Sequence, residues 1–210
     1  RDIPASEFGD LGAIRSMQEY KALFYVDDRV YADWERWAER FLGHVNPYTG
    51  LALKDDPALI SLSLVNEANP AQCWEISPRI VKLYRRKFEE WGKNNPDKTF
   101  EQFLSHLAVK RFNEMKHSLR KIGCSALLTD QNFMNRLHLA ADRRHYDFVD
   151  NHAYWDHPRF AEKRWRLPVL PSQINPLAAR PGVPGAAFPT RLFGKGFSLS
   201  EFDYANPNIY

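Results

Sequence analysis

The chain has 210 residues, of which 44% are hydrophobic and 14% aromatic, a composition typical of one ordinary globular domain. Its net charge of +3 comes from 29 basic and 26 acidic residues, and this near balance argues against a nucleic-acid partner. No apolar run is long enough to span a membrane, and the two cysteines are too few for a disulfide framework.

The first segment of the chain is polar, and residues 1–25 predict a long loop. It begins without Met and lacks the apolar core of a signal peptide, so we expect a mature or truncated product. Residues 33–41 then place Trp34, Trp37 and Phe41 at helical spacing, which predicts a helix with these aromatic side chains in the core.

The rest of the chain alternates between predicted strands and predicted helices. We expect strands over 59–65, 125–129, 148–150 and 196–200, helices over 78–91, 99–122 and 136–145, a short extended piece within 168–175, and a long loop over 176–189. Such alternation is typical of an α/β protein with a parallel sheet or barrel.

Polar and aromatic residues recur at the carboxyl ends of the predicted strands. They are Asn66 and Glu67, then Asp130 and Asn132, then His152, Tyr154 and Trp155, and finally Glu201. In a (β/α)-barrel, strand ends of this kind gather catalytic groups onto one rim. The recurrence therefore indicates an active-site face, although any one of these glutamates taken alone is more simply a solvated loop residue.

Two carboxylates on separate strand ends suit one particular chemistry. Retaining glycoside hydrolysis uses two carboxyl groups about 5 to 5.5 Å apart, one as acid and then base, the other as nucleophile. Aromatic walls keep such an acid protonated by desolvation and also stack on sugar rings. Trp74 and Trp155 are candidates for these walls, with ordinary core packing as the alternative for each.

Several motifs together resemble the clan A glycoside hydrolases, nearest to family 5 with its cellulases and mannanases. They are Asn46-Pro47-Tyr48-Thr49-Gly50, Asp56-Pro57, Val65-Asn66-Glu67, Asn151-His152-Ala153-Tyr154-Trp155 and Ser200-Glu201-Phe202. The resemblance implies a (β/α)8 TIM barrel forming a single domain over residues 1–210, with Glu67 as acid/base and Glu201 as nucleophile. It also implies that Asn66 binds the sugar 2-hydroxyl and that His152 and Tyr154 line the site and help to orient the nucleophile. We expect Asn132 and Trp155, at the predicted strand ends, to contact the substrate as well.

The same resemblance implies that the barrel is incomplete. Residues 59–65 would be strand four and 196–200 strand seven, so the family's arginine on strand two and tryptophan on strand eight have no counterpart in this sequence. We therefore expect part of a larger hydrolase. Action on external polysaccharide would make the protein secreted or periplasmic.

Other kinds of site find little support in the sequence. There is no His-Glu-x-x-His, no Gly-x-Ser-x-Gly and no glycine-rich phosphate loop, so we expect neither a catalytic metal nor a cofactor. The expected partner is a carbohydrate substrate, without nucleic acid or membrane. The alternatives are a carbohydrate-binding pseudoenzyme with the same cleft and an inactive fragment of a hydrolase.

Overall fold

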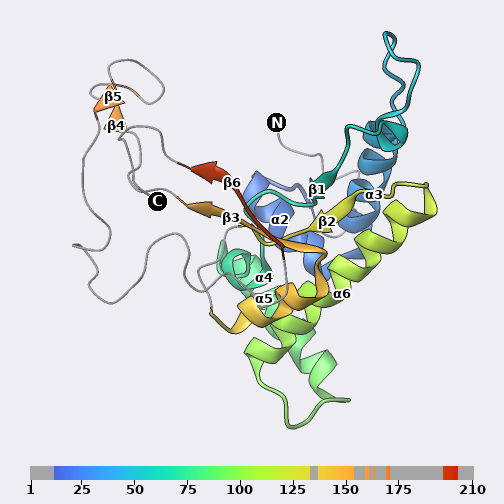
Figure 1. Cartoon of the computed structure of the whole chain (residues 1–210). Coiled ribbons are helices and arrows are strands. Elements are labelled where there is room, and N and C mark those ends of the chain that lie inside the picture. The colour runs from blue at the N-terminus through green and yellow to red at the C-terminus, as the bar shows by residue number, and fades with distance from the viewer. Residues whose placement is uncertain are drawn as a thin grey trace.

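The computed structural model describes residues 12–132, 137–153, 159–160, 163, 169–170 and 196–202 (Figure 1). In chain order, the elements are α2 (Met17–Val26), α3 (Asp28–Leu42), η2 (Leu53–Asp55), β1 (Ser61–Ser63), α4 (Pro70–Cys73), α5 (Pro78–Gly92), α6 (Phe100–Lys121), β2 (Leu127–Thr129), η3 (Leu137–His145), β3 (Phe148–Ala153), β4 (Arg159–Phe160), β5 (Val169–Leu170) and β6 (Gly196–Phe202).

Helices α5 and α6 confirm the two longest predicted helices. The side chain of Thr99 accepts from the backbone N–H of Gln102, and the Gln102 side chain accepts from the Thr99 N–H, which completes a capping box at the start of α6. At the other end Gly123 has a φ of 90°, a conformation open to glycine at little cost. The predicted helix over 136–145 is instead the 3-10 helix η3.

The loop predicted for residues 1–25 is wrong where the structure describes it, because Met17–Val26 forms α2. The side chain of Ser16 accepts from the Glu19 N–H and caps this helix. Residues 21–25 are all buried, since α2 packs against α4, α5 and α6. A helix buried on several sides has no polar face, and this is why the amphipathic pattern of a surface helix did not reveal it.

Helix α3 corrects part of the predicted core. Trp34 and Ala38 are buried, 7% and 4% exposed, whereas Trp37 and Phe41 are 57% and 49% exposed. Spacing by four residues along the helix puts Val30, Trp34 and Ala38 on one inward face. Trp37 and Phe41 share the outward face, where their rings stack with centroids 5.1 Å apart.

The main strands lie side by side in the order β1-β2-β3-β6. β1 pairs with β2, and β3 with β6, both in parallel. Between these pairs, the Asp147 N–H donates to the Leu128 carbonyl at 2.9 Å and the Thr129 hydroxyl to the Phe148 carbonyl at 2.8 Å. Because the partners advance together along both segments, β3 also runs parallel to β2. The strands are shorter than predicted at β1 and β2 and longer at β3 and β6.

The pairing of β3 with β6 contains one irregularity. Residues 148–151 pair one to one with 196–199, and the register then shifts so that His152 pairs with Glu201. Ser200 is the extra residue, as in a β-bulge. β4 and β5 form a separate antiparallel pair, with β5 inside the expected extended piece, while the expected loop over 176–189 lies outside the described residues.

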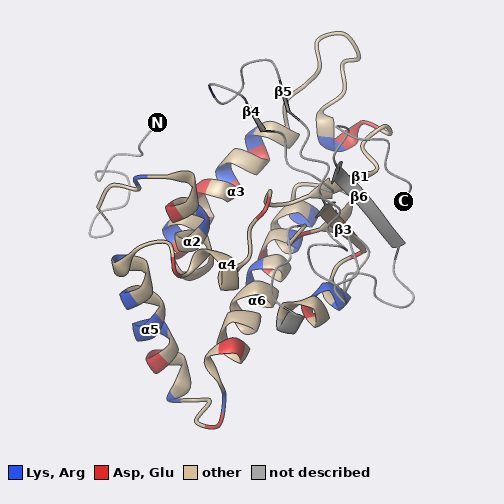
Figure 2. Cartoon of the chain, turned by 90° about the vertical axis from the view of Figure 1, so that its left-hand side faces the viewer, with Lys and Arg blue, Asp and Glu red and all other residues tan. Residues whose placement is uncertain are grey.

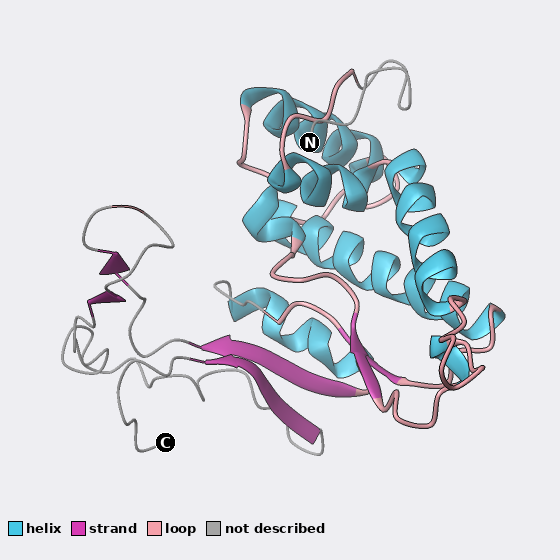
Figure 3. Ribbon diagram, turned by 90° about the horizontal axis from the view of Figure 1, so that it is seen from above, coloured by secondary structure: helices cyan, strands magenta, loops and turns pink. Residues whose placement is uncertain are grey.

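Most of the described helices gather on one side of the strands (Figure 3). The core lies between α2, α5, α6 and the strands; within it the Tyr84 hydroxyl donates to the Ala22 carbonyl at 2.7 Å. Lysine, arginine and acidic residues are interspersed along these helices rather than segregated by sign (Figure 2). The described strands form two-stranded pairs and do not close into a barrel, so the (β/α)8 fold stays a prediction.

Candidate functional site

Glu67 lies in a sharp turn just beyond the carboxyl end of β1. Its φ of 47° is in the left-handed region, which a side chain with a Cβ rarely adopts. Both of its backbone polar groups have partners: the Asn132 Oδ1 accepts from the Glu67 N–H at 2.8 Å, and the Lys21 ammonium donates to the Glu67 carbonyl at 3.3 Å. These bonds stabilise a strained conformation of the kind that clusters at functional sites.

The carboxyl group of Glu67 meets His152. Its Oε1 lies 3.0 Å from the His152 Nδ1, and the side chains are 36% and 2% exposed, respectively. No described residue bonds to Oε2, so within the described residues only Oε1 of the carboxyl group has a partner. A carboxyl group held in this way is available to exchange a proton with a bound molecule.

The end of β2 supports the Glu67 turn through two side chains. The Asp130 Oδ1 accepts from the Val65 N–H at 3.2 Å, and Asn132 accepts from Glu67 as described. Between them, Gln131 has a φ of 54°. It is the second non-glycine residue in the left-handed region among the described residues. Asn132 also donates through Nδ2 to the Ser63 hydroxyl at 3.0 Å and accepts, through its carbonyl, from the His152 N–H at 2.7 Å.

Asp130 is a buried carboxyl group, 1% exposed, beneath this turn. Burial raises its pKa from the ordinary 3.8 to about 7, against the smaller lowering effects of bonds from the Gln131 and Val65 backbones and of the Arg143 charge. Arg143 itself donates to the Asn151 side chain at 2.8 Å and to the Gln131 carbonyl. The polar layer under the site is therefore continuous from β2 through η3 to β3.

The backbone of Glu201 lies next to this site. It lies on β6 opposite His152, which in turn contacts Glu67. The three residues thus come from the ends of β1, β3 and β6, as a rim of strand ends predicts. The side chain of Glu201 and the whole of Tyr154 and Trp155 lie outside the described residues, and their predicted roles stay predictions.

The other predicted site residues differ in their surroundings. Asn66 is exposed beside Glu67, whereas Asn132 is 2% exposed and both ends of its amide are bonded within the protein. Trp74 lies edge-on against Phe100, 4.7 Å between ring centroids, with the Arg85 guanidinium 4.9 Å above its ring. These contacts favour the packing interpretation of Trp74.

Lys21 lies near the site and was not among the residues predicted from the sequence. It is 7% exposed and contacts the backbone of Glu67 from α2, a segment predicted to be a loop. The available signal was a single lysine next to the apolar run Ala22-Leu23-Phe24-Tyr25. A lysine is rarely buried without a partner, so its position indicates a polar contact inside the fold.

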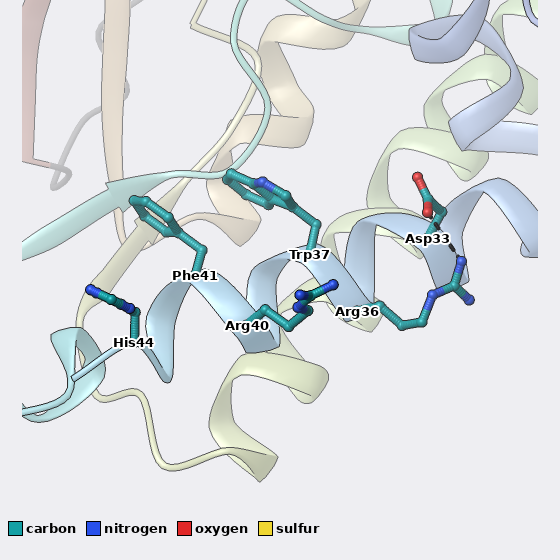
Figure 4. A pocket seen from close by; sticks show the side chains of 6 residues that line it. All are labelled: Asp33, Arg36, Trp37, Arg40, Phe41 and His44. Atoms are coloured by element: carbon teal, nitrogen blue, oxygen red, sulfur yellow. Dashed lines mark hydrogen bonds and ion pairs between the residues drawn. The ribbon is translucent and has the colours of Figure 1, made fainter. Parts of the chain in front are cut away.

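A separate depression of about 520 Å³ lies on the outside of α3 (Figure 4). It is lined by Asp33, Arg36, Trp37, Arg40, Phe41 and His44. Arg36 is paired with Asp33 at 3.0 Å, and the stacked Trp37 and Phe41 form the apolar part. Its lining comes from α3 and the residues just after it, and includes no residue of the Glu67 turn.

No group of three histidine, cysteine, aspartate or glutamate side chains that could hold a metal occurs in the described part of the chain. Cys73 and Cys124 are both buried and free, as small core residues. Of the described helices, none combines the length and the apolar character needed to cross a bilayer.

Comparisons with known proteins add no neighbour to this picture. No family model, no curated protein and no solved structure matches the chain.

Proposed function

We propose that the chain is a retaining glycoside hydrolase that cleaves β-linked bonds in oligo- or polysaccharides, built on part of a (β/α)8 barrel. The single observation that carries the proposal is the contact between the Glu67 carboxyl group and His152, which itself pairs along the strands with Glu201. The support is therefore a bonded pair of Glu67 and His152 that lies beside the backbone of Glu201. The motif resemblance assigns the same three residues to one site.

The chemistry follows from these positions. Glu67 donates a proton to the glycosidic oxygen while Glu201 attacks the anomeric carbon, so the leaving sugar departs as an alcohol and a glycosyl ester forms on Glu201. Glu67, now ionised, takes a proton from water, whose oxygen attacks the same carbon and releases Glu201. His152 orients the Glu67 carboxyl group through Oε1 and leaves Oε2 for the substrate.

The test is hydrolysis of a panel of β-linked oligosaccharides by the full chain, measured as new reducing ends. Glu201→Gln should abolish turnover on every substrate while the melting transition stays cooperative. Glu67→Gln should lose activity on ordinary oligosaccharides but form the glycosyl-enzyme from substrates with an activated aryl leaving group, since such a group needs no proton. Glu89→Gln, an exposed glutamate on α5, is the matched control and should match the parent protein.

Two results would overturn the proposal. Retained turnover in Glu201→Gln would remove the nucleophile from the mechanism. Binding of an oligosaccharide by the parent protein without release of reducing ends from any substrate would favour the carbohydrate-binding alternative.

A further inference from the structure

We propose that Asn132, supported by Asp130, is a positioning residue that sets the geometry between Glu67 and His152, rather than a substrate contact. This role rests on the proposed function, because it concerns the placement of the proposed acid/base. The strand-end pattern predicted only that Asn132 lies in the site; the proposal adds that it positions Glu67 and His152.

Asn132 bonds the backbones of both partners at once. Its side-chain Oδ1 accepts from the Glu67 N–H at 2.8 Å, and its carbonyl accepts from the His152 N–H at 2.7 Å. The 3.0 Å contact between Oε1 and Nδ1 therefore joins two residues that are already fixed to the same asparagine. A shift of Asn132 would move both ends of the contact.

The two side chains at the end of β2 continue the strand pairing beyond the point where backbone pairing stops. The last backbone bond between the segments is from the Leu64 N–H to the Thr129 carbonyl, at 3.0 Å. Past it, Asp130 accepts from Val65 and Asn132 from Glu67. Because side-chain oxygens replace backbone carbonyls as acceptors here, the backbone can turn away from the strand direction. Gln131 and Glu67 thus adopt left-handed conformations while the N–H groups of Val65 and Glu67 keep their partners.

The burial of Asn132 favours a positioning role over direct contact with a substrate. The residue is 2% exposed, and its amide nitrogen is occupied by the Ser63 hydroxyl at 3.0 Å. A buried amide with both ends bonded inside the protein has little left to offer a sugar. Removal of the side chain would leave the Glu67 N–H without its partner, and the strained φ would relax toward an ordinary value.

The experiment compares Asn132→Ala, Asn132→Asp and Ser63→Ala on two kinds of substrate. Misplacement by about 1 Å costs on the order of 10²-fold in rate. Asn132→Ala should therefore lose about 10²-fold in kcat on an ordinary oligosaccharide, with KM within about twofold, and should lose little in the glycosylation step with an activated aryl glycoside. Asn132→Asp keeps the Oδ1 acceptor and should be intermediate. Ser63→Ala removes only the other bond of the amide and should stay near the parent.

A rise in KM with both substrates, at unchanged kcat, would overturn positioning in favour of substrate binding. Crystal structures of the variants test the same point without activity. In Asn132→Ala, the Glu67 φ should leave the left-handed region and the Oε1–Nδ1 distance should exceed 3.5 Å; retention of both would refute the inference. If the parent protein cleaves no substrate, the proposed function fails while this structural result still stands or falls alone. If the alanine variant does not fold, Asn132→Asp supplies the kinetic test: a lower kcat at unchanged KM supports positioning, and a raised KM at unchanged kcat overturns it.

Discussion

The Glu67 Oε1 and the His152 Nδ1 lie 3.0 Å apart although 85 positions separate the residues in the sequence. The contact crosses β2, since Glu67 follows β1 and His152 belongs to β3. A hydrogen on Nδ1 can be donated to Oε1 both when Glu67 is ionised and when Glu67 carries its proton on Oε2, the oxygen left for the substrate. The pair is thus competent for both protonation states that the two steps of the proposed mechanism require.

Removal of the histidine should impair proton transfer more than binding. We expect His152→Ala to lower kcat on an ordinary oligosaccharide by about 10- to 10²-fold, because the Glu67 carboxyl group would no longer be oriented. His152→Asn places an amide nitrogen near the position of Nδ1 and should recover part of this loss. His117→Ala, an exposed histidine on α6, is the control in the same kinetic assay. Unchanged kcat in His152→Ala would contradict the assigned role.

The buried Asp130 should leave a signature in the dependence of stability on pH. Its pKa is raised by burial to about 7, so between about pH 4 and pH 7 the folded protein keeps a proton that the unfolded chain has released. This contribution to the unfolding free energy is therefore largest below about pH 4 and declines as pH rises to about 7, by at most about 1.4 kcal/mol per pH unit. Among the described residues, Arg143, Tyr25 and Tyr146 interact electrostatically with Asp130, and burial raises the pKa of both tyrosines well above the ordinary value of 10.

Asp130→Asn isolates that effect, because the amide oxygen still accepts from Val65 but no longer titrates. Denaturant unfolding of both proteins from pH 4 to pH 7 should show the parent losing stability relative to the variant as pH rises. A constant difference across the range would mean that Asp130 keeps its ordinary pKa. The same variant should retain activity, since its acceptor for the Glu67 turn is intact.

The ion pair between Glu19 and Arg79 should stabilise the junction of α2 with α5. Arg79 donates through Nε to one Glu19 oxygen at 2.6 Å and through Nη2 to the other at 2.8 Å, and the Glu19 side chain is 7% exposed. Arg79→Ala should lower the unfolding free energy by about 1 to 3 kcal/mol at pH 7, because a buried carboxylate loses charged donors. Arg79→Lys should recover part of the lost unfolding free energy, because it keeps the positive charge but not the two parallel donors.

A pH titration and a surface pair complete this test. The bond from Arg79 is the main reason that the pKa of Glu19 is lowered, so its contribution is present above the ordinary value of 4.5 and disappears as pH falls through the lowered pKa. Arg86→Ala breaks an exposed pair with Glu90 at 3.9 Å and should cost less than about 1 kcal/mol. Equal losses from Arg79→Ala and Arg86→Ala would show that burial adds nothing to the first pair.

Sequence periodicity and capping were sufficient for α5 and α6, because these helices have one apolar face and clear end signals. They failed for α2, which is buried on several sides, and for Trp37 and Phe41, whose exposure depends on the exact orientation of α3. Hydrophobic spacing gives the approximate face of a helix but not which aromatic side chains at its border remain in solvent.

The candidate site divides in a similar way. The strand-end pattern predicted that Glu67 and His152 would lie on one rim, and their contact agrees with it. The functions of Asp130 and Asn132 could not be predicted, because each acts on a backbone N–H of another strand and depends on the register of β1 with β2. Register is a tertiary property that neither composition nor residue spacing specifies.

The single extra residue on β6 determines which amino acid stands beside the histidine. If the one-to-one pairing of 148–151 with 196–199 continued without the bulge, Ser200 would lie opposite His152. Glu201 would then lie opposite Ala153. Strand length is consequently a constraint separate from side-chain identity. An insertion of one residue between Gly196 and Leu199 would leave every proposed catalytic group in the sequence and yet move the glutamate out of register with its partner.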